Sequence, residues 1–157
     1  MRKLLAVCVV VCIAVSMAMA VEYQKKDVIE FGGSANYASI DGNTMITLAP
    51  EYQYFVSDNT SLGGVFSYTD TEWTDSTTAI LLAPRYFFDT KKKDVHAYGS
   101  ILFNLQKDLN AFGFGLGLRR KILANALFNL ELRYLGGDLK QTGLFAGFSL
   151  YTKKNKK

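Results

Sequence analysis

The stretch TMITLAPEYQYF, residues 44–55, alternates between apolar side chains and side chains that are small or polar. The apolar set is Ile46, Leu48, Pro50, Tyr52 and Tyr54, and the set between them is Thr47, Ala49, Glu51 and Gln53. Successive side chains of a β-strand point to opposite faces, so a period of two is typical of a strand with one apolar face. The stretch VIEFGGSANYAS, residues 28–39, alternates in the same way.

This alternation continues to the C-terminus. It predicts eight strands, at residues 28–39, 44–55, 61–71, 77–88, 94–106, 110–120, 124–135 and 141–152. Each is about 11 residues long, close to the roughly 9 to 11 that a tilted strand needs to cross a hydrocarbon layer. An even number of antiparallel strands with short turns closes into a barrel without an exposed sheet edge. We therefore predict an all-β fold, an eight-stranded antiparallel up-and-down transmembrane β-barrel.

The positions of the lysines favour a membrane barrel over a soluble one. A lipocalin-like soluble barrel has an apolar lumen and a wet exterior, whereas an outer-membrane barrel has the reverse. The lysines of the predicted mature chain lie at turns, strand ends or the termini: Lys25, Lys26, Lys91, Lys92, Lys93, Lys107, Lys121, Lys140 and the tail from Lys153. Because the strand middles contain none, we predict that the apolar face contacts lipid. A soluble periplasmic ligand-binding barrel is the alternative interpretation.

The N-terminal segment has the pattern of a secretory signal. Arg2 and Lys3 precede the apolar run LLAVCVVVCIAV, and SMAMA follows with small residues at the positions that a signal peptidase needs. We predict a cleaved signal at residues 1–20, a barrel at 21–152 and a basic tail at 153–157.

Both cysteines, Cys8 and Cys12, lie in the predicted signal. The mature chain would therefore have no disulfide and no thiol chemistry. Loss of Arg2 and Lys3 lowers the formal net charge from +4 to +2, so the charge does not indicate a nucleic-acid partner.

The two predicted faces differ in side-chain size. Small groups line the polar face, including the row Gly113, Gly115 and Gly117, which suits a narrow interior. Aromatic side chains occur toward both ends of the apolar face, and amphipathic rings favour membrane interfaces. The candidate aromatic girdles are Tyr37, Tyr52, Tyr54, Phe66, Tyr68, Tyr86, Phe88 and Tyr134.

Two copies of one motif place an acid and a base at equivalent positions. In LAPEYQYF, residues 48–55, and LAPRYFF, residues 82–88, the residue after the proline is Glu51 or Arg85, which points to the polar face. We predict that the two pair as the centre of a lumenal charge network. The other predicted members are Glu30, Arg119, Glu131 and Arg133. Eight strands leave an interior only wide enough for side chains, so buried acids and bases must balance.

The stretch YFVSDNTSLGGVFSY, residues 54–68, resembles the second strand, tight periplasmic turn and third strand of the small outer-membrane β-barrel superfamily, which includes OmpX-like proteins and the OmpA transmembrane domain. The resemblance extends over the whole mature chain in strand number and spacing. It implies the outer membrane of a Gram-negative-type bacterium, periplasmic termini, and periplasmic turns at 56–60, 89–94 and 120–124. Implied partners are membrane lipid, lipopolysaccharide and the barrel-assembly machinery during insertion. Such chains often end on an aromatic residue, whereas this one ends TKKNKK.

Catalysis has little support in the sequence. His96 is the single histidine, it follows the turn KKKD, and no convincing nucleophile arrangement accompanies it. The stretch DTEWTD, residues 70–75, lacks the glycine turn of a calcium loop. We therefore predict no enzymatic activity, no metal site and no cofactor.

Because the lumen of such a barrel is filled, we predict that the protein is a small integral outer-membrane β-barrel. We expect it to be a monomer with a structural role and no efficient pore. Binding or adhesion through the outer loops is the alternative function. Trp73, in the most acidic loop, is the candidate contact for that function, although it is also suited to the headgroup region.

Overall fold

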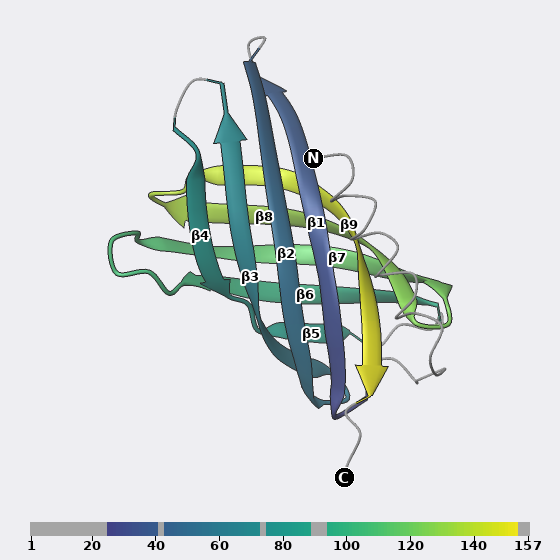
Figure 1. Ribbon diagram of the computed structural model, residues 1–157. Helices are drawn as coiled ribbons and strands as arrows, with labels where there is room; N and C mark the ends of the chain where they lie inside the picture. The colour runs from purple at the N-terminus through teal and green to yellow at the C-terminus, as the bar shows by residue number, and fades with distance from the viewer. Residues whose placement is uncertain (1–24, 41–42, 73–74, 89–93, 154–157) are drawn as a thin grey trace.

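The computed structural model describes residues 25–40, 43–72, 75–88 and 94–153 (Figure 1). The strands are β1 (Val28–Ile40), β2 (Asn43–Ser57), β3 (Thr60–Thr71), β4 (Thr77–Leu82), β5 (Arg85–Phe88), β6 (Val95–Asn104), β7 (Ala111–Leu123), β8 (Ala126–Gly137) and β9 (Gln141–Lys153). Within these ranges, no helix is long and apolar enough to cross a membrane.

These strands form one closed antiparallel sheet. Apart from β4 and β5, each strand pairs with its neighbours along the chain, and β1 also pairs with β9, from Val28 opposite Lys153 to Ala35 opposite Ala146. β4 and β5 both lie between β3 and β6, so they are two parts of one wall strand. The wall therefore has eight strands, and the predicted eight-stranded antiparallel barrel is confirmed. Figure 1 shows β1 to β4 crossing over β6 to β9, as the tilted strands of a barrel do.

A proline lacks the backbone N–H, which predicts a bulge or bend where it enters a strand. The wall strand is interrupted at Pro84, between β4 and β5. However, β4 ends with Leu82 opposite Gly64, and β5 begins with Arg85 opposite Ser61. The same number of residues separates these pairs on both strands, so Pro84 interrupts the ladder without shifting its register.

The first copy of the motif behaves differently. β2 runs through Pro50, which stays paired with Gly33 of β1, and only the pairing with β3 lapses beside it. Neither proline therefore introduces the extra residue of a β-bulge, which was one of the two expected outcomes; at Pro84 the strand is interrupted instead. The register shifts occur instead close to turns, between Phe55 and Ser57 and between Lys121 and Leu123, where the barrel wall ends.

The turns divide the barrel into two ends. β1 begins and β9 finishes at one end, where the β2–β3 and β7–β8 turns and the adjoining ends of β5 and β6 also lie; we name it the terminal end. At the other end, which we name the loop end, lie the β6–β7 and β8–β9 turns and the adjoining ends of β1, β2, β3 and β4. β7 extends to Leu123 and β8 begins at Ala126, so the β7–β8 turn is shorter than the predicted 120–124 segment.

Burial separates the two faces of the wall as the alternation predicted. Large apolar side chains point outward and stay exposed along every wall strand, including Phe31, Leu48, Phe66, Ile80, Phe103, Leu116, Leu132 and Leu144. The predicted girdle residues Tyr37, Tyr52, Phe66, Tyr68, Tyr86, Phe88 and Tyr134 are exposed on this face. Tyr54 is half-buried, and its hydroxyl donates to Asp27 Oδ1 at 2.7 Å.

Candidate functional site: the filled barrel interior

The interior of the barrel is stacked in layers. The terminal layer consists of Val28, Phe55, Phe87, Tyr98, Leu127 and Tyr151. The loop-side layer consists of Ala49, Val65, Ala79, Leu81, Ala83, Leu102, Leu135 and Phe145. Along β8, Glu131 and Arg133 lie between Leu127 of the first layer and Leu135 of the second. A charged layer is thus enclosed between two apolar ones.

All six residues of the predicted charge network lie in this charged layer. They are Glu30, Glu51, Arg85, Arg119, Glu131 and Arg133, each with at most 9% of its surface exposed. Alternation along the strands brings them there, because each occupies an inward position of its strand. A buried ion without a partner costs several kcal/mol, roughly, so their arrangement determines whether the layer is stable.

Glu51 and Arg85, the residues that follow the two prolines, form a bidentate pair. Arg85 Nη1 donates to Glu51 Oε1 at 3.0 Å, and Nη2 donates to Glu51 Oε2 at 2.6 Å. The planar guanidinium matches the carboxylate in this geometry, which is the strong form of the interaction.

The other four residues extend this pair in both directions. On one side, Arg119 Nη2 lies 3.5 Å from Glu51 Oε1, and Arg119 Nη1 donates to Glu30 Oε2 at 2.6 Å. On the other side, Arg85 Nη2 lies 3.6 Å from Glu131 Oε2. Arg133 Nη2 donates to the same Glu131 oxygen at 3.0 Å. The layer is therefore one chain in which acids and bases alternate, in the order Glu30, Arg119, Glu51, Arg85, Glu131 and Arg133.

Two further polar residues complete this chain. The Tyr98 hydroxyl donates to Glu131 Oε2 at 3.0 Å, and the Ser100 hydroxyl donates to Glu131 Oε1 at 3.0 Å. Neither Tyr98 nor Ser100 was among the predicted members of the network. The alternation along β6 could have identified them, because Tyr98 and Ser100 are two residues apart and therefore lie on the same face of that strand.

Aromatic faces cover the guanidinium groups from both apolar layers. Arg119 lies 4.7 Å from the ring centre of Tyr98 and 5.2 Å from that of Phe87. Arg133 lies 4.4 Å from the ring centre of Phe145 in the loop-side layer. Rings attract cations through their negative faces, so these layers stabilise the charges that they enclose.

The glycines of β7 make room for the network. A Cβ added at Gly115 would overlap Glu131 Oε1 and Ser100 Oγ, and one added at Gly117 would overlap the ring of Tyr98. The predicted row of small residues therefore has a specific steric role, because longer side chains from β6 and β8 fill the space above it.

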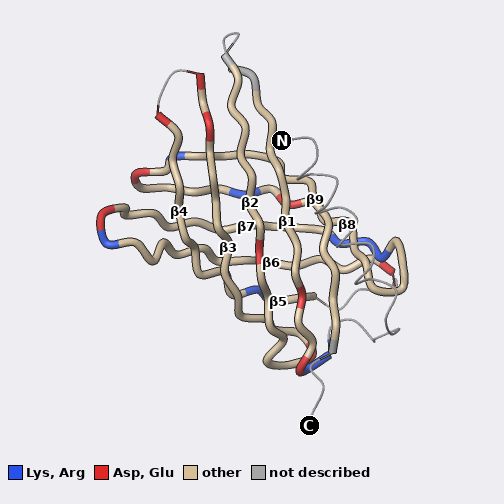
Figure 2. The backbone as a smooth tube through the Cα atoms, in the orientation of Figure 1, with Lys and Arg blue, Asp and Glu red and all other residues tan. Residues whose placement is uncertain are grey.

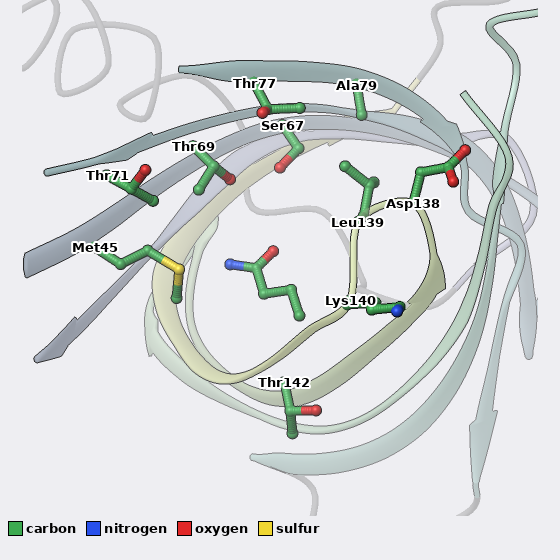
Figure 3. Close-up of a pocket in the computed structure, with 11 residues that line it drawn as sticks. Met45, Ser67, Thr69, Thr71, Thr77, Ala79, Asp138, Leu139, Lys140 and Thr142 are labelled. Atoms are coloured by element: carbon green, nitrogen blue, oxygen red, sulfur yellow. The ribbon is translucent and has the colours of Figure 1, made fainter. Parts of the chain in front are cut away.

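A recess of about 320 Å³ opens beyond the loop-side layer. Its walls come from β2, β3, β4, β9 and the β8–β9 turn. The lining residues are Met45, Ser67, Thr69, Thr71, Thr77, Ala79, Asp138, Leu139, Lys140, Gln141 and Thr142 (Figure 3). This recess could not be predicted from the sequence, because the residues that form it are far apart along the chain.

Charged residues outside the layer occur mainly toward the two ends of the barrel, as the coloured backbone shows (Figure 2). The loop end has the acids Asp70, Glu72, Asp75, Asp108 and Asp138 with the bases Lys107 and Lys140. The terminal end has Lys25, Lys26, Arg120 and Lys121 with the acids Asp27, Asp58 and Asp94. Acids thus predominate around the described part of the loop end, where the predicted contact Trp73 itself lies outside the described residues.

One carboxylate at the terminal end holds the segment just before β1 to the β2–β3 turn. Asp58 Oδ1 accepts the backbone N–H of Lys26 at 3.0 Å, and Oδ2 lies 3.4 Å from Lys25 Nζ. The Lys26 hydrogen bond, assisted by the Lys25 ammonium, holds the pKa of Asp58 below its ordinary value.

His96 lies in β6 near the terminal end, half-buried and opposite Arg119 in the strand register. Among the described residues, no group of three or more His, Cys, Asp or Glu side chains could hold a metal ion. The arrangement that the structure does present is a set of ion pairs buried between apolar layers, together with a polar recess at one mouth.

Neither a protein-family model nor a curated protein sequence matches the chain. Two solved structures are similar to it in fold. A chain from the de novo design of transmembrane beta-barrels has a TM-score of 0.60 at 14% identity, over 82% of this chain and 98% of that one. The outer membrane protein OprG from Pseudomonas aeruginosa has a TM-score of 0.53 at 14% identity, over 83% of this chain and 99% of its own. The chain therefore has the fold of a transmembrane β-barrel, as its resemblance to the small outer-membrane barrels implied.

Proposed function

We propose that the protein is a small integral outer-membrane β-barrel with a structural role and no efficient pore. The observation that carries this proposal is the combination of an apolar exterior with an interior sealed at two levels. Each half of the combination supports a different part of the proposal.

The exterior supports contact with lipid. Exposing apolar surface to water costs about 25 cal/mol for each Å². Side chains such as Phe114, Leu116 and Phe148 have more than half of their surface exposed, at 53%, 60% and 60%. A soluble barrel would direct such residues inward, whereas a lipid environment makes this face favourable. The membrane reading is therefore preferred over a lipocalin-like barrel.

The interior supports a structural role. Solutes would have to pass the terminal layer, the charged layer and the loop-side layer, and each is packed with buried side chains. The charged layer carries equal numbers of acids and bases, which are linked as one alternating chain of ion pairs. Opening a passage would break several of these ion pairs in a medium of low dielectric constant, at a cost of several kcal/mol for each, roughly.

We further propose that the protein has no enzymatic activity and works as a monomer. The buried carboxylates are held by arginines, and His96 lies toward the terminal end rather than at the recess. Lipid and lipopolysaccharide would be its surroundings, with the termini in the periplasm and the barrel-assembly machinery needed during insertion. Loop-end binding is a second candidate function, because the recess offers a concave polar surface there.

Cell fractionation would test the membrane assignment. The chain should be expressed with residues 1–20 and recovered from separated outer-membrane and periplasmic fractions. We expect it in the outer membrane, with a gel mobility in detergent that changes on boiling, as for a folded lipid-embedded barrel. Recovery as a soluble periplasmic protein without that change would contradict the proposal.

A conductance measurement would test the sealed interior. The purified barrel, shown to be folded by the boiling shift, should be inserted into planar bilayers and compared with a variant in which Phe87 and Phe145 are replaced by alanine. We expect no stable conductance from the wild type, because both apolar layers are complete. Stable channels at every wild-type insertion would contradict a filled lumen.

A further inference from the structure

The recess at the loop end is a closed cup rather than the start of a passage. Its floor is formed with Ala79, which also belongs to the loop-side apolar layer, and Leu139 packs against that layer. Solutes that enter the recess therefore meet packed apolar side chains beneath it. Its volume of about 320 Å³ lies at the lower end of the range for small-molecule sites.

Hydroxyl groups dominate one wall of the cup. Figure 3 shows Ser67, Thr69 and Thr71 of β3 and Thr77 of β4 along this wall, with Leu139 projecting toward them from the β8–β9 turn. Hydroxyl groups both donate and accept hydrogen bonds, so such a wall can pair with ligand hydroxyls in either direction.

Hydrogen bonds fix the deeper polar groups in place. Gln141 Nε2 donates to Thr47 Oγ1 at 2.7 Å, and Thr47 Oγ1 lies 3.1 Å from Thr69 Oγ1. Gln141 and Thr69 line the cup, and Thr47 lies buried behind them. The polar wall is therefore ordered before a ligand arrives, which lowers the entropic cost of binding.

The charges around the cup favour an uncharged ligand. Asp138 and Lys140 both line it, so the lining itself has no net charge. Asp70, Glu72 and Asp75 lie on the neighbouring strand ends and make the surrounding rim acidic, which opposes anions. Met45, Ala79 and Leu139 add apolar surface on which the C–H faces of a ring can pack.

We propose that this recess binds a small neutral saccharide unit. Sugar hydroxyls would pair with the Ser67, Thr69 and Thr77 wall, and the sugar C–H groups would contact Leu139. This inference goes beyond a structural role, because it assigns a ligand to the loop end. The saccharide could belong to a glycolipid of the surrounding membrane or arrive free in solution, and the experiment below separates these two sources.

Saturation-transfer NMR would test the proposal on the full barrel refolded in a detergent without a sugar headgroup. The probes are glucose, N-acetylglucosamine and maltose, with glucose 6-phosphate as the charged comparison. We expect transfer to a neutral probe and weaker transfer to the phosphate. Absence of transfer to all three neutral sugars, with the boiling shift intact, would overturn the proposal.

Matched variants locate the site. In Ser67→Ala/Thr77→Val two cup hydroxyls are lost with little change of shape, and we expect about tenfold weaker saccharide affinity, since a hydrogen bond contributes about 0.5 to 1.5 kcal/mol. Thr78→Val is the control, because Thr78 is exposed and adjacent in β4 but does not line the cup. Equal affinity in the double variant and the wild type would overturn the assignment. If the double variant does not fold, as judged by loss of its boiling shift, the single variant Thr77→Val replaces it in this test, because Thr77 lies at an exposed rim position.

Repeating the NMR measurement with the barrel in lipid vesicles would identify the source of the saccharide. Displacement of the bound probe by lipopolysaccharide in the same bilayer would identify the membrane glycolipid as the source, whereas unchanged probe binding would identify a free saccharide. Both outcomes, displacement and unchanged binding, require that the probe binds the cup. Neither depends on the result of the cell fractionation. Failure of the membrane assignment and failure of this inference are therefore distinguishable.

Discussion

The two faces of the barrel wall differ in chemistry: the inward face buries paired charges, and the outward face exposes apolar side chains. Glu51 and Arg85, on the inward face, are bonded to each other and to neighbouring ions, with 9% and 2% of their surfaces exposed. The residues just before them in the two copied motifs, Pro50 and Pro84, face outward and alter the ladder without shifting its register. The role of the duplicated motif therefore lies in its inward residue, because Glu51 of one copy pairs with Arg85 of the other.

The largest expected effect comes from removing one member of that pair. Arg85→Ala leaves the Glu51 carboxylate in the charged layer without its bidentate partner, and breaking a buried pair in this way costs about 3 to 5 kcal/mol. The double variant Glu51→Gln/Arg85→Met should lose less, because the remaining two acids and two bases still balance. The free energy of unfolding in urea, measured in lipid vesicles, would check this order.

The choice of double variant follows from the geometry. Exchanging the two residues would bring an arginine at 51 against Arg119 and a glutamate at 85 against Glu131, at positions now 3.5 and 3.6 Å apart. Like charges would then meet at both ends of the exchanged pair, so the neutral variant is the cleaner control. Equal losses for the single and neutral double variants would contradict a pairwise interaction.

Two leucines of similar exposure test whether the outward apolar face contacts lipid. Leu116 and Leu123 are 60% and 64% exposed in β7, but the first lies in the middle of the strand and the second at its end. In a bilayer, Leu116→Lys should cost about 2 to 4 kcal/mol and Leu123→Lys about 0 to 1, because the penalty falls toward the interface. Unfolding in vesicles measures both. Similar small losses would indicate that water, rather than lipid, surrounds the wall.

Alternation along the strands was sufficient to predict this fold. A period of two specified which residues of β1, β2 and β8 point inward, so Glu30, Glu51, Glu131 and Arg133 could be assigned to one face before their neighbours were known. The break at Pro84 could also be anticipated from its missing donor. Whether either proline adds a bulge could not be predicted from its own strand, because the register depends on both strands of the ladder.

The order of the ion pairs could not be predicted in the same way. Arg119 and Glu30 are far apart along the chain, and closure of the barrel through β1 and β9 sets their positions relative to each other. The stagger of the whole sheet determines which inward residues share a level, and no local pattern encodes it. The recess was missed for the same reason, since β3, β4 and the β8–β9 turn meet only in the closed barrel.

A smaller effect is expected from glycines on the two faces. Gly115→Ala should destabilise the barrel by about 1 to 3 kcal/mol, because the new methyl group overlaps Glu131 and Ser100 and forces the charged layer to repack. Gly99→Ala, on the adjacent strand β6, is the control, since its Cβ would come no closer than 3.9 Å to its neighbours. Urea unfolding of both variants would check this, and equal losses would contradict a steric role for the inward glycine.

The smallest effect should occur at the rim, where charges are solvated. The pKa of Asp58 is lowered in the fold, so its contribution to stability is present above the unfolded value of about 3.9 and is lost as the pH falls through the lowered folded value. Asp58→Asn should therefore lower stability slightly at neutral pH, where the charged carboxylate contributes, and flatten the fall in stability toward acid pH. Unfolding midpoints measured between neutral and acidic pH would check this. Since the first cause is the backbone N–H of Lys26, Lys25→Met should retain most of the acid dependence, and complete loss in that variant would assign the effect to the exposed ion pair instead.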